Sequence, residues 1–150
     1  MHTQTEQTLY GGAITEIKTN TFSGILDCGT DLDDVIRLPE IEGLTTGKPI
    51  YDFVCTSHYH QDHIGRINEI LPEIPVYLSN TSRAIYERVF TFSKSKGNIT
   101  RPTINLEDGK TIKIKDLSLT SYVIDHSAYD ARMTLIETAD GKRILHTRRL

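Results

Sequence analysis

The chain has 150 residues, enough for one domain with a buried core, and its 37% apolar and 25% charged residues are typical of a globular protein. A net charge of −3 excludes a protein-wide attraction to nucleic acid, although a local basic groove would suffice for an RNA or DNA substrate. No apolar run approaches the roughly 20 residues that span a bilayer, and the polar first residues do not show the basic-then-apolar pattern of a signal peptide. We expect a soluble, cytoplasmic protein without membrane association.

The first half of the chain predicts strands followed by helices. Residues 13–19 alternate apolar and polar side chains, and residues 23–29 form a short buried run, so the two predict a pair of strands. Residues 31–49 predict a short helix and then a loop broken by proline and glycine. Residues 50–56 predict a strand buried on both faces. Apolar residues at helical spacing predict a helix over 64–71.

The second half predicts another group of strands. Residues 75–79 form a brief strand, and residues 80–96 begin with good N-cap residues and predict a helix. An Asp-Gly turn within 105–114 predicts a hairpin. A strand is expected over 117–125 and a further hairpin over 133–147. Strands separated by helices predict one α/β (α+β) domain over residues 1–150, in which helices cover a sheet.

The two cysteines, Cys28 and Cys55, are far apart, and each lies in an apolar run. This placement predicts buried thiols rather than a disulfide framework, which fits a reducing compartment.

The segment "TSHYHQDHIG", residues 56–65, contains three of the six histidines of the chain. Side chains two apart on an extended segment point the same way, so His58 and His60 project together. Asp62 and His63 follow where the chain turns into the predicted helix. Imidazole and carboxylate groups gathered in this way predict a metal site. A purely structural zinc site is disfavoured because such sites are usually rich in cysteine.

The segment "HYHQDHIG" resembles the H-x-H-x-D-H-x-x-G signature of the metallo-β-lactamase fold hydrolases. The segment "GILDCG" is similar to the first motif of that family, and "DHSAYDARMTLIETADGKRILHT" is similar to the next one, a histidine at a strand end followed by a hairpin. The sequences of these segments are most similar to those of the ribonuclease J-like and β-CASP branch. The resemblance covers most of residues 10–147.

The resemblance implies an αββα sandwich, of which this chain supplies the N-terminal half to two-thirds. It implies that His58, His60 and His126 bind a first zinc ion and that Asp62 and His63 belong to a second. Asp27 would orient these ligands by hydrogen bonds. The sequence alone is equally consistent with an aspartate that only forms the turn after a strand. His146 is expected to be an ordinary strand residue, and Ser127 and Tyr129 are expected to pack within their loop rather than meet substrate.

The pattern breaks after Thr147, where Arg148 and Arg149 stand in place of the Gly-Asp pair of the next family motif. The family's bridging aspartate and its second half therefore have no counterpart, and we expect a domain that is incomplete at the C-terminus. A truncated or frameshifted product, a fragment, and a half-fold completed by a homo-oligomer or a second chain all remain open. One sheet would then expose an apolar face.

The resulting hypothesis is a zinc-dependent hydrolase that acts on phosphodiester bonds in RNA or DNA, in which Asp62 holds or accepts the proton of the attacking water. Three alternatives remain open: a non-catalytic remnant or interaction module with at most one metal site, a thioester or lactam hydrolase, and a mononuclear site for iron or manganese. The substrate-binding residues stay unknown.

Overall fold

The computed structural model describes residues 2–7, 12–30, 39–92 and 98–147. Its first sheet has the strand order β1-β2-β3-β4-β5, with the first three strands antiparallel and the last three parallel. Its second sheet is an antiparallel meander, β6-β7-β8-β9. The strands are β1 (His2–Gln7), β2 (Ala13–Lys18), β3 (Ser23–Cys28), β4 (Phe53–Cys55), β5 (Val76–Tyr77), β6 (Thr111–Ile114), β7 (Leu117–Val123), β8 (Arg132–Thr138) and β9 (Arg143–His146).

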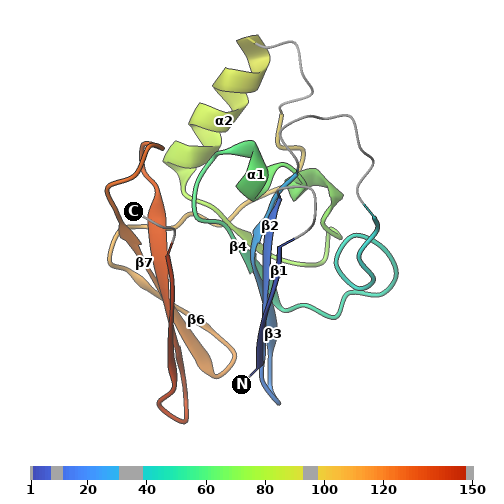
Figure 1. Ribbon diagram of the computed structural model, residues 1–150, viewed down its shortest axis with the longest axis vertical. Helices are drawn as coiled ribbons and strands as arrows, with labels where there is room; N and C mark the ends of the chain where they lie inside the picture. The colour runs from blue at the N-terminus through green and yellow to red at the C-terminus, as the bar shows by residue number, and fades with distance from the viewer. Residues whose placement is uncertain (1, 8–11, 31–38, 93–97, 148–150) are drawn as a thin grey trace.

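The two sheets pack face to face (Figure 1). Alternating side chains on β7 and β8 point inward, so Leu117, Leu119 and Ile136 are fully buried against the first sheet. Leu26 and Phe53 oppose them from β3 and β4. This apolar layer joins the two sheets into one unit.

The other face of the first sheet is covered by the helices α1 (Gln61–Ile64), η1 (Ile67–Glu69) and α2 (Asn80–Phe92). Ile64, Ile67 and Tyr86 come from these helices and are buried against strand residues such as Ile25 and Val54. Helices therefore cover a sheet, and the predicted α/β class is confirmed. No helix among the described residues is long and apolar enough to cross a membrane.

The single helix predicted over 64–71 is wrong, because the chain forms two short helices there. In a continuous helix the amide of Arg66 would bond to the carbonyl four residues earlier. Instead it donates to the Cys28 carbonyl oxygen at 3.0 Å, which ends α1. The Arg66 guanidinium is buried and donates to Glu69 and to the Pro39 carbonyl oxygen, which fixes the turn.

Two further predictions fail in part. The strand predicted over 50–56 is only Phe53–Cys55, and Ile50 is 56% exposed. The helix predicted within 31–49 lies partly outside the described residues, and residues 39–49 contain no helix.

The hairpin predicted over 105–114 is wrong. The Asp108-Gly109 turn precedes β6, and the true hairpin joins β6 to β7. Before that turn, Ile104 pairs with Tyr77 of the first sheet, so this part of the chain is not available to pair with β6. The predicted strand pair in residues 13–29, the helix that begins at residue 80, the strand that begins at residue 117 and the final hairpin are confirmed.

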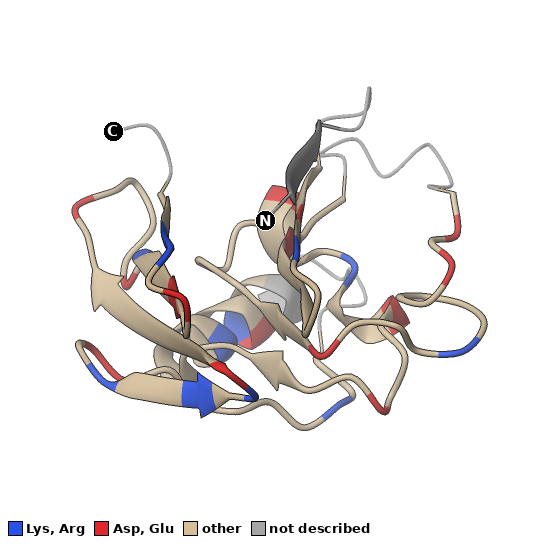
Figure 2. Ribbon diagram, turned by 90° about the horizontal axis from the view of Figure 1, so that it is seen from below, with Lys and Arg blue, Asp and Glu red and all other residues tan. Residues whose placement is uncertain are grey.

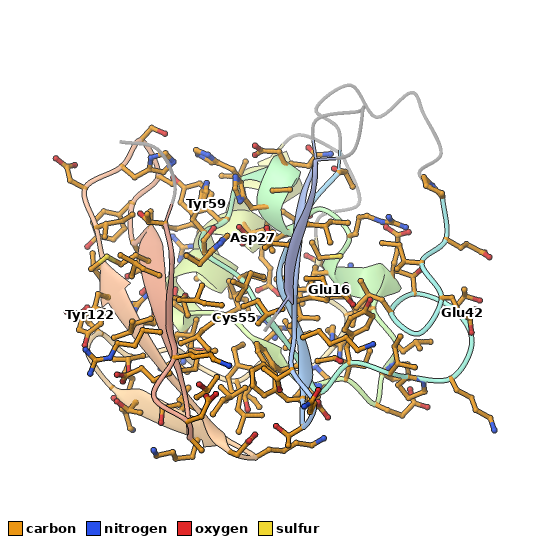
Figure 3. All side chains as sticks on the ribbon, turned by 60° about the horizontal axis from the view of Figure 1, so that its bottom comes forward. Glu16, Asp27, Glu42, Cys55, Tyr59 and Tyr122 are labelled. Carbon is orange, nitrogen blue, oxygen red and sulfur yellow. The ribbon has the colours of Figure 1, made fainter. Side chains whose placement is uncertain are left out.

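The side of the second sheet that faces away from the first sheet carries four apolar side chains. Tyr122 pairs with Met133, and Leu135 pairs with Leu145, on the side opposite to Ile136. Tyr122 and Leu145 are exposed, and Figure 3 shows Tyr122 at the outer side of this sheet. We call these four residues the outer apolar face.

Candidate metal centre

The histidines gather where the two sheets meet, at the ends of β3 and β4. These strands run parallel, so their carboxyl ends reach the same edge and place Asp27 beside Ser57 and the residues that follow it. Figure 3 shows Asp27 and Tyr59 near this edge, with Cys55 deeper between the sheets. The second sheet contributes His126, just after β7, and His146, in β9.

Three imidazoles form the first group. His58, His60 and His126 each offer a nitrogen within 4.8 Å of the other two, and Nε2 of His58 lies 3.2 Å from Nδ1 of His60. The ring centroid of His58 lies 5.0 Å from that of His126. Three imidazole nitrogens at this separation fit one divalent metal ion.

His58 is suited to metal binding by its surroundings. Burial lowers its pKa to about 3, and the charges of His63, His60 and His126 add to this, against an opposing effect of Asp27. The imidazole is therefore neutral near pH 7 and keeps a lone pair for a metal ion.

Asp62 and His63 form a second group beside the first. Nδ1 of His63 lies 2.8 Å from Oδ2 of Asp27, and Nε2 of His63 lies 3.3 Å from Oδ2 of Asp62. When Nδ1 carries the only hydrogen of His63, its Nε2 and the Asp62 carboxylate are two acceptors that face each other. A cation between them would satisfy both. The ring of His63 lies 4.0 Å from that of His58, so the two groups adjoin.

Asp27 holds the centre of this network. Its Oδ1 accepts from the Ser57 amide at 2.7 Å, and its Oδ2 lies near the Ser57 hydroxyl, His63 and His146. Burial alone would raise the pKa of Asp27, but hydrogen bonds from His146 and His63, together with their charges, lower it well below the usual range. Its backbone has a φ of 61°, a conformation uncommon for residues other than glycine, which turns the carboxylate toward these donors.

The loop that carries His126 is anchored on both sides. Ala128 and Ala131 are buried, and Asp130 bonds to Ser79, at the start of α2, and to the buried guanidinium of Arg132. The Arg132 amide donates to the Ser57 carbonyl oxygen at 3.0 Å. This contact fastens the second sheet to the segment that bears His58.

Sequence reasoning missed three features of this region: the Ser57 hydroxyl, His146 and the Asp130–Arg132 ion pair. His146 is a strand residue as expected, but its Nε2 also lies 3.3 Å from Oδ2 of Asp27. The sequence did offer a signal for this contact. Ile144 packs between the sheets, and His146, two positions further along the same strand, faces the same side.

The expectation for Tyr129 and Ser127 is wrong, whereas the expectation of buried cysteines is confirmed. Tyr129 is 74% exposed and Ser127 is also exposed, so the prediction that they pack within their loop is wrong. Cys28 and Cys55 are buried free thiols, as predicted, and burial raises the pKa of each to about 12.

No model of a known protein family matches the chain. Ribonuclease J from Sinorhizobium meliloti is 28% identical over 131 residues, which cover 82% of this chain and 23% of that protein. A protein of unknown function from Enterococcus faecalis V583 has a TM-score of 0.73 and 24% identity over 92% of this chain and 41% of that one. The MIM-2 metallo-β-lactamase has a TM-score of 0.65 and 19% identity over 91% of this chain and 54% of that one.

A third similar structure is the metallo-β-lactamase fold protein YhfI from Bacillus subtilis, with a TM-score of 0.58 and 17% identity over 90% of this chain. The chain is a metallo-β-lactamase fold protein. It spans less than a quarter of the ribonuclease J sequence that it matches and about half of the MIM-2 and YhfI chains.

The metallo-β-lactamase fold brings together every metal-ligand candidate that the sequence suggested. His58, His60 and His126 form one group, Asp62 and His63 form the adjoining one, and Asp27 contacts the second group directly. Arg148 and Arg149, which stand where the sequence motif breaks, lie outside the described residues.

Proposed function

We propose that this chain forms the metal centre of a zinc-dependent hydrolase that cleaves phosphodiester bonds in RNA or DNA. The main support is a set of three histidines whose imidazole nitrogens lie within 4.8 Å of one another, next to Asp62 and His63. The ribonuclease name of the curated relative supports the nucleic-acid substrate.

His58, His60 and His126 would hold the first zinc ion, and Asp62 and His63 would contribute to a second. A bound zinc ion supplies Lewis acidity, which makes water a nucleophile near neutral pH and polarises a phosphoryl oxygen. The donor types also suit other divalent ions, so iron and manganese belong in the metal titration.

Asp62 is the residue to which we assign proton transfer. Its side chain is 25% exposed, so one side can meet substrate and water while Oδ2 faces His63. A carboxylate in this position holds the attacking water and accepts its proton. Asp27 is fully buried and already surrounded by donors, so it orients His63 instead.

We expect the isolated chain to bind about one zinc ion tightly, because the described residues give three ligands to the first group and only two to the second. Weak hydrolysis, or none, is expected to accompany this. Full two-metal turnover by the isolated chain would contradict this expectation.

The test is a substrate panel with the zinc-loaded chain: a labelled single-stranded RNA, the matching DNA, a thioester and a β-lactam. The proposal predicts that any hydrolysis by the zinc-loaded chain acts on RNA or DNA rather than on the two acyl substrates, and that this cleavage is lost in Asp62→Asn. Hydrolysis of only the thioester or the lactam would replace the phosphodiester assignment. Figure 2 shows Lys and Arg residues interspersed with Asp and Glu residues along the ribbon.

A second candidate function is a non-catalytic module that keeps one metal and associates with another chain. The outer apolar face favours it, because Leu145 is 53% exposed there and Tyr122 lies beside Met133. Size-exclusion chromatography with the activity panel separates the two. A monomer with turnover supports the hydrolase, and an obligate oligomer without turnover supports the module.

A further inference from the structure

The Ser57 hydroxyl lies between the buried carboxylate and the first group of histidines. Its Oγ is 3.0 Å from Oδ2 of Asp27 and 2.9 Å from Nδ1 of His58. Ser57 is only 4% exposed, so water does not replace these contacts easily. The same hydroxyl lies 3.4 Å from Nδ1 of His63, but that nitrogen is closer, at 2.8 Å, to the carboxylate oxygen itself and so does not depend on Ser57.

The positions of the hydrogens follow from what each group can donate. A carboxylate surrounded by donors only accepts, so the single hydroxyl hydrogen of Ser57 goes to Asp27. The hydroxyl oxygen of Ser57 is then left as an acceptor. The hydrogen bond between Ser57 and His58 is therefore donated by Nδ1–H of His58. A neutral imidazole has one N–H, so Nε2 of His58 keeps its lone pair. That nitrogen lies 3.2 Å from His60, on the metal side.

We propose that Ser57 is a positioning residue, whose hydroxyl passes the hydrogen bond of Asp27 on to Nδ1 of His58 and so keeps Nε2 of His58 free for a metal ion. One buried carboxylate then fixes the proton position in both groups of ligands, directly at His63 and through Ser57 at His58. The inference rests on the proposed metal site, but the proton position is a property of the metal-free protein.

Removing the hydroxyl has a defined consequence. In Ser57→Ala, a hydrogen on Nδ1 of His58 would lack its acceptor, whereas a hydrogen on Nε2 could be donated to Nδ1 of His60, 3.2 Å away. The proton therefore moves to the nitrogen that faces the metal position. A metal ion would then have to displace it, which weakens binding by about tenfold, as is usual for the loss of a partner behind a ligand.

The experiment is long-range ¹H–¹⁵N correlation NMR of the imidazoles in the full, metal-free chain, for the parent, Ser57→Ala and Ser57→Thr. We expect an Nδ1–H tautomer at His58 in the parent and in Ser57→Thr, which keeps the hydroxyl, and an Nε2–H tautomer in Ser57→Ala. His63 should stay Nδ1–H in all three, because its bond to Asp27 is direct. Zinc affinity, measured by chelator competition, should fall about tenfold in Ser57→Ala only.

An Nε2–H tautomer at His58 in the parent would overturn the proposal, as would an unchanged tautomer in Ser57→Ala. A simultaneous change at His63 would also overturn it, since it would show general disruption. If Ser57→Ala does not fold, Ser57→Cys takes its place, because a thiol fills the site but bonds weakly. Failure of the parent to bind zinc would refute the metal site, while the tautomer measurement would still decide the role of Ser57.

Discussion

Asp27 forms hydrogen bonds with residues of both sheets and so connects the two groups of proposed ligands. It reaches Ser57 and His63 in the first sheet's edge loop and His146 in the second sheet. The resemblance to the metallo-β-lactamase fold hydrolases implied that this aspartate ends a strand and orients the ligands by hydrogen bonds, but it did not identify the hydrogen-bond partners. Its contact with His146, 119 residues later, depends on how the sheets pack, which no local pattern predicts.

Asp27→Asn tests this network. The amide would direct hydrogens at groups that already donate, so we expect a loss of about 3 kcal/mol in the free energy of unfolding of the metal-free protein. Urea unfolding measures it, with exposed Glu73→Gln as a control that should stay within about 0.5 kcal/mol. A loss no greater than that of the control would show that Asp27 is not needed for folding.

The same variant has a predicted pH dependence. Folding lowers the pKa of Asp27 below 3.8, so its contribution is fully present above about pH 4 and is lost as the pH falls further. The stability difference between the parent and Asp27→Asn should therefore shrink below about pH 4. A difference that grows on acidification would contradict the lowered pKa.

His58 predicts an acid effect at higher pH. Its pKa is lowered by burial from 6.5 to about 3, so the unfolded chain binds more protons between these values. The metal-free protein should lose stability as the pH falls through this window, with His58 contributing up to about 1.4 kcal/mol per pH unit. His58→Gln should show a shallower slope in unfolding experiments with a chelator present. Equal slopes for the two proteins would argue against a neutral, buried His58.

At the scale of elements, the site depends on how closely α1 approaches the end of β3. A Cβ on Gly29 would lie 1.7 Å from the carbonyl oxygen of Asp62. The helix predicted over 64–71 did not include this approach, since the hydrogen bond from the Arg66 amide to the Cys28 carbonyl oxygen is a tertiary contact. Periodicity predicted a helix after the histidine segment, but it could not predict where that helix begins and ends.

Gly29→Ala and Gly24→Ala form a matched pair. Both should destabilise the protein, because the new Cβ at residue 24 would meet the Phe53 ring at 2.2 Å. Only Gly29→Ala should also weaken metal binding, since it displaces the backbone of Asp62 and His63. Unfolding curves and zinc competition measure the two effects. Equal loss of zinc affinity in both variants would show that the effect reports stability alone.

At the scale of the whole molecule, the proposed metal site spans both sheets, because His126 follows β7 while His58 and His60 follow β4. The class of fold could be predicted from the sequence. Four of the ligand candidates lie together in residues 58–63, whereas His126 was assigned through the resemblance to the metallo-β-lactamase fold hydrolases. The Asp-Gly hairpin was wrong because Ile104 pairs with Tyr77 of the other sheet, a choice that depends on the assembled molecule.

The packing of the two sheets predicts an asymmetry between leucines. Leu119→Ala removes a side chain that is fully buried between the sheets, and should cost about 3 kcal/mol in the free energy of unfolding. Leu145→Ala, on the outer apolar face, should cost less than about 1 kcal/mol. Denaturant unfolding of the metal-free chain distinguishes them. A comparable cost for both would mean that the outer apolar face is covered in solution.

The most direct test of the metal centre is the zinc content of the chain after saturation and removal of excess metal, compared with His58→Ala and His126→Ala. The parent should retain about one zinc ion per chain by elemental analysis, and each variant should retain little or none, because each removes one of three ligands. A parent without zinc, or variants that retain as much as the parent, would contradict the assignment of these histidines to a metal centre.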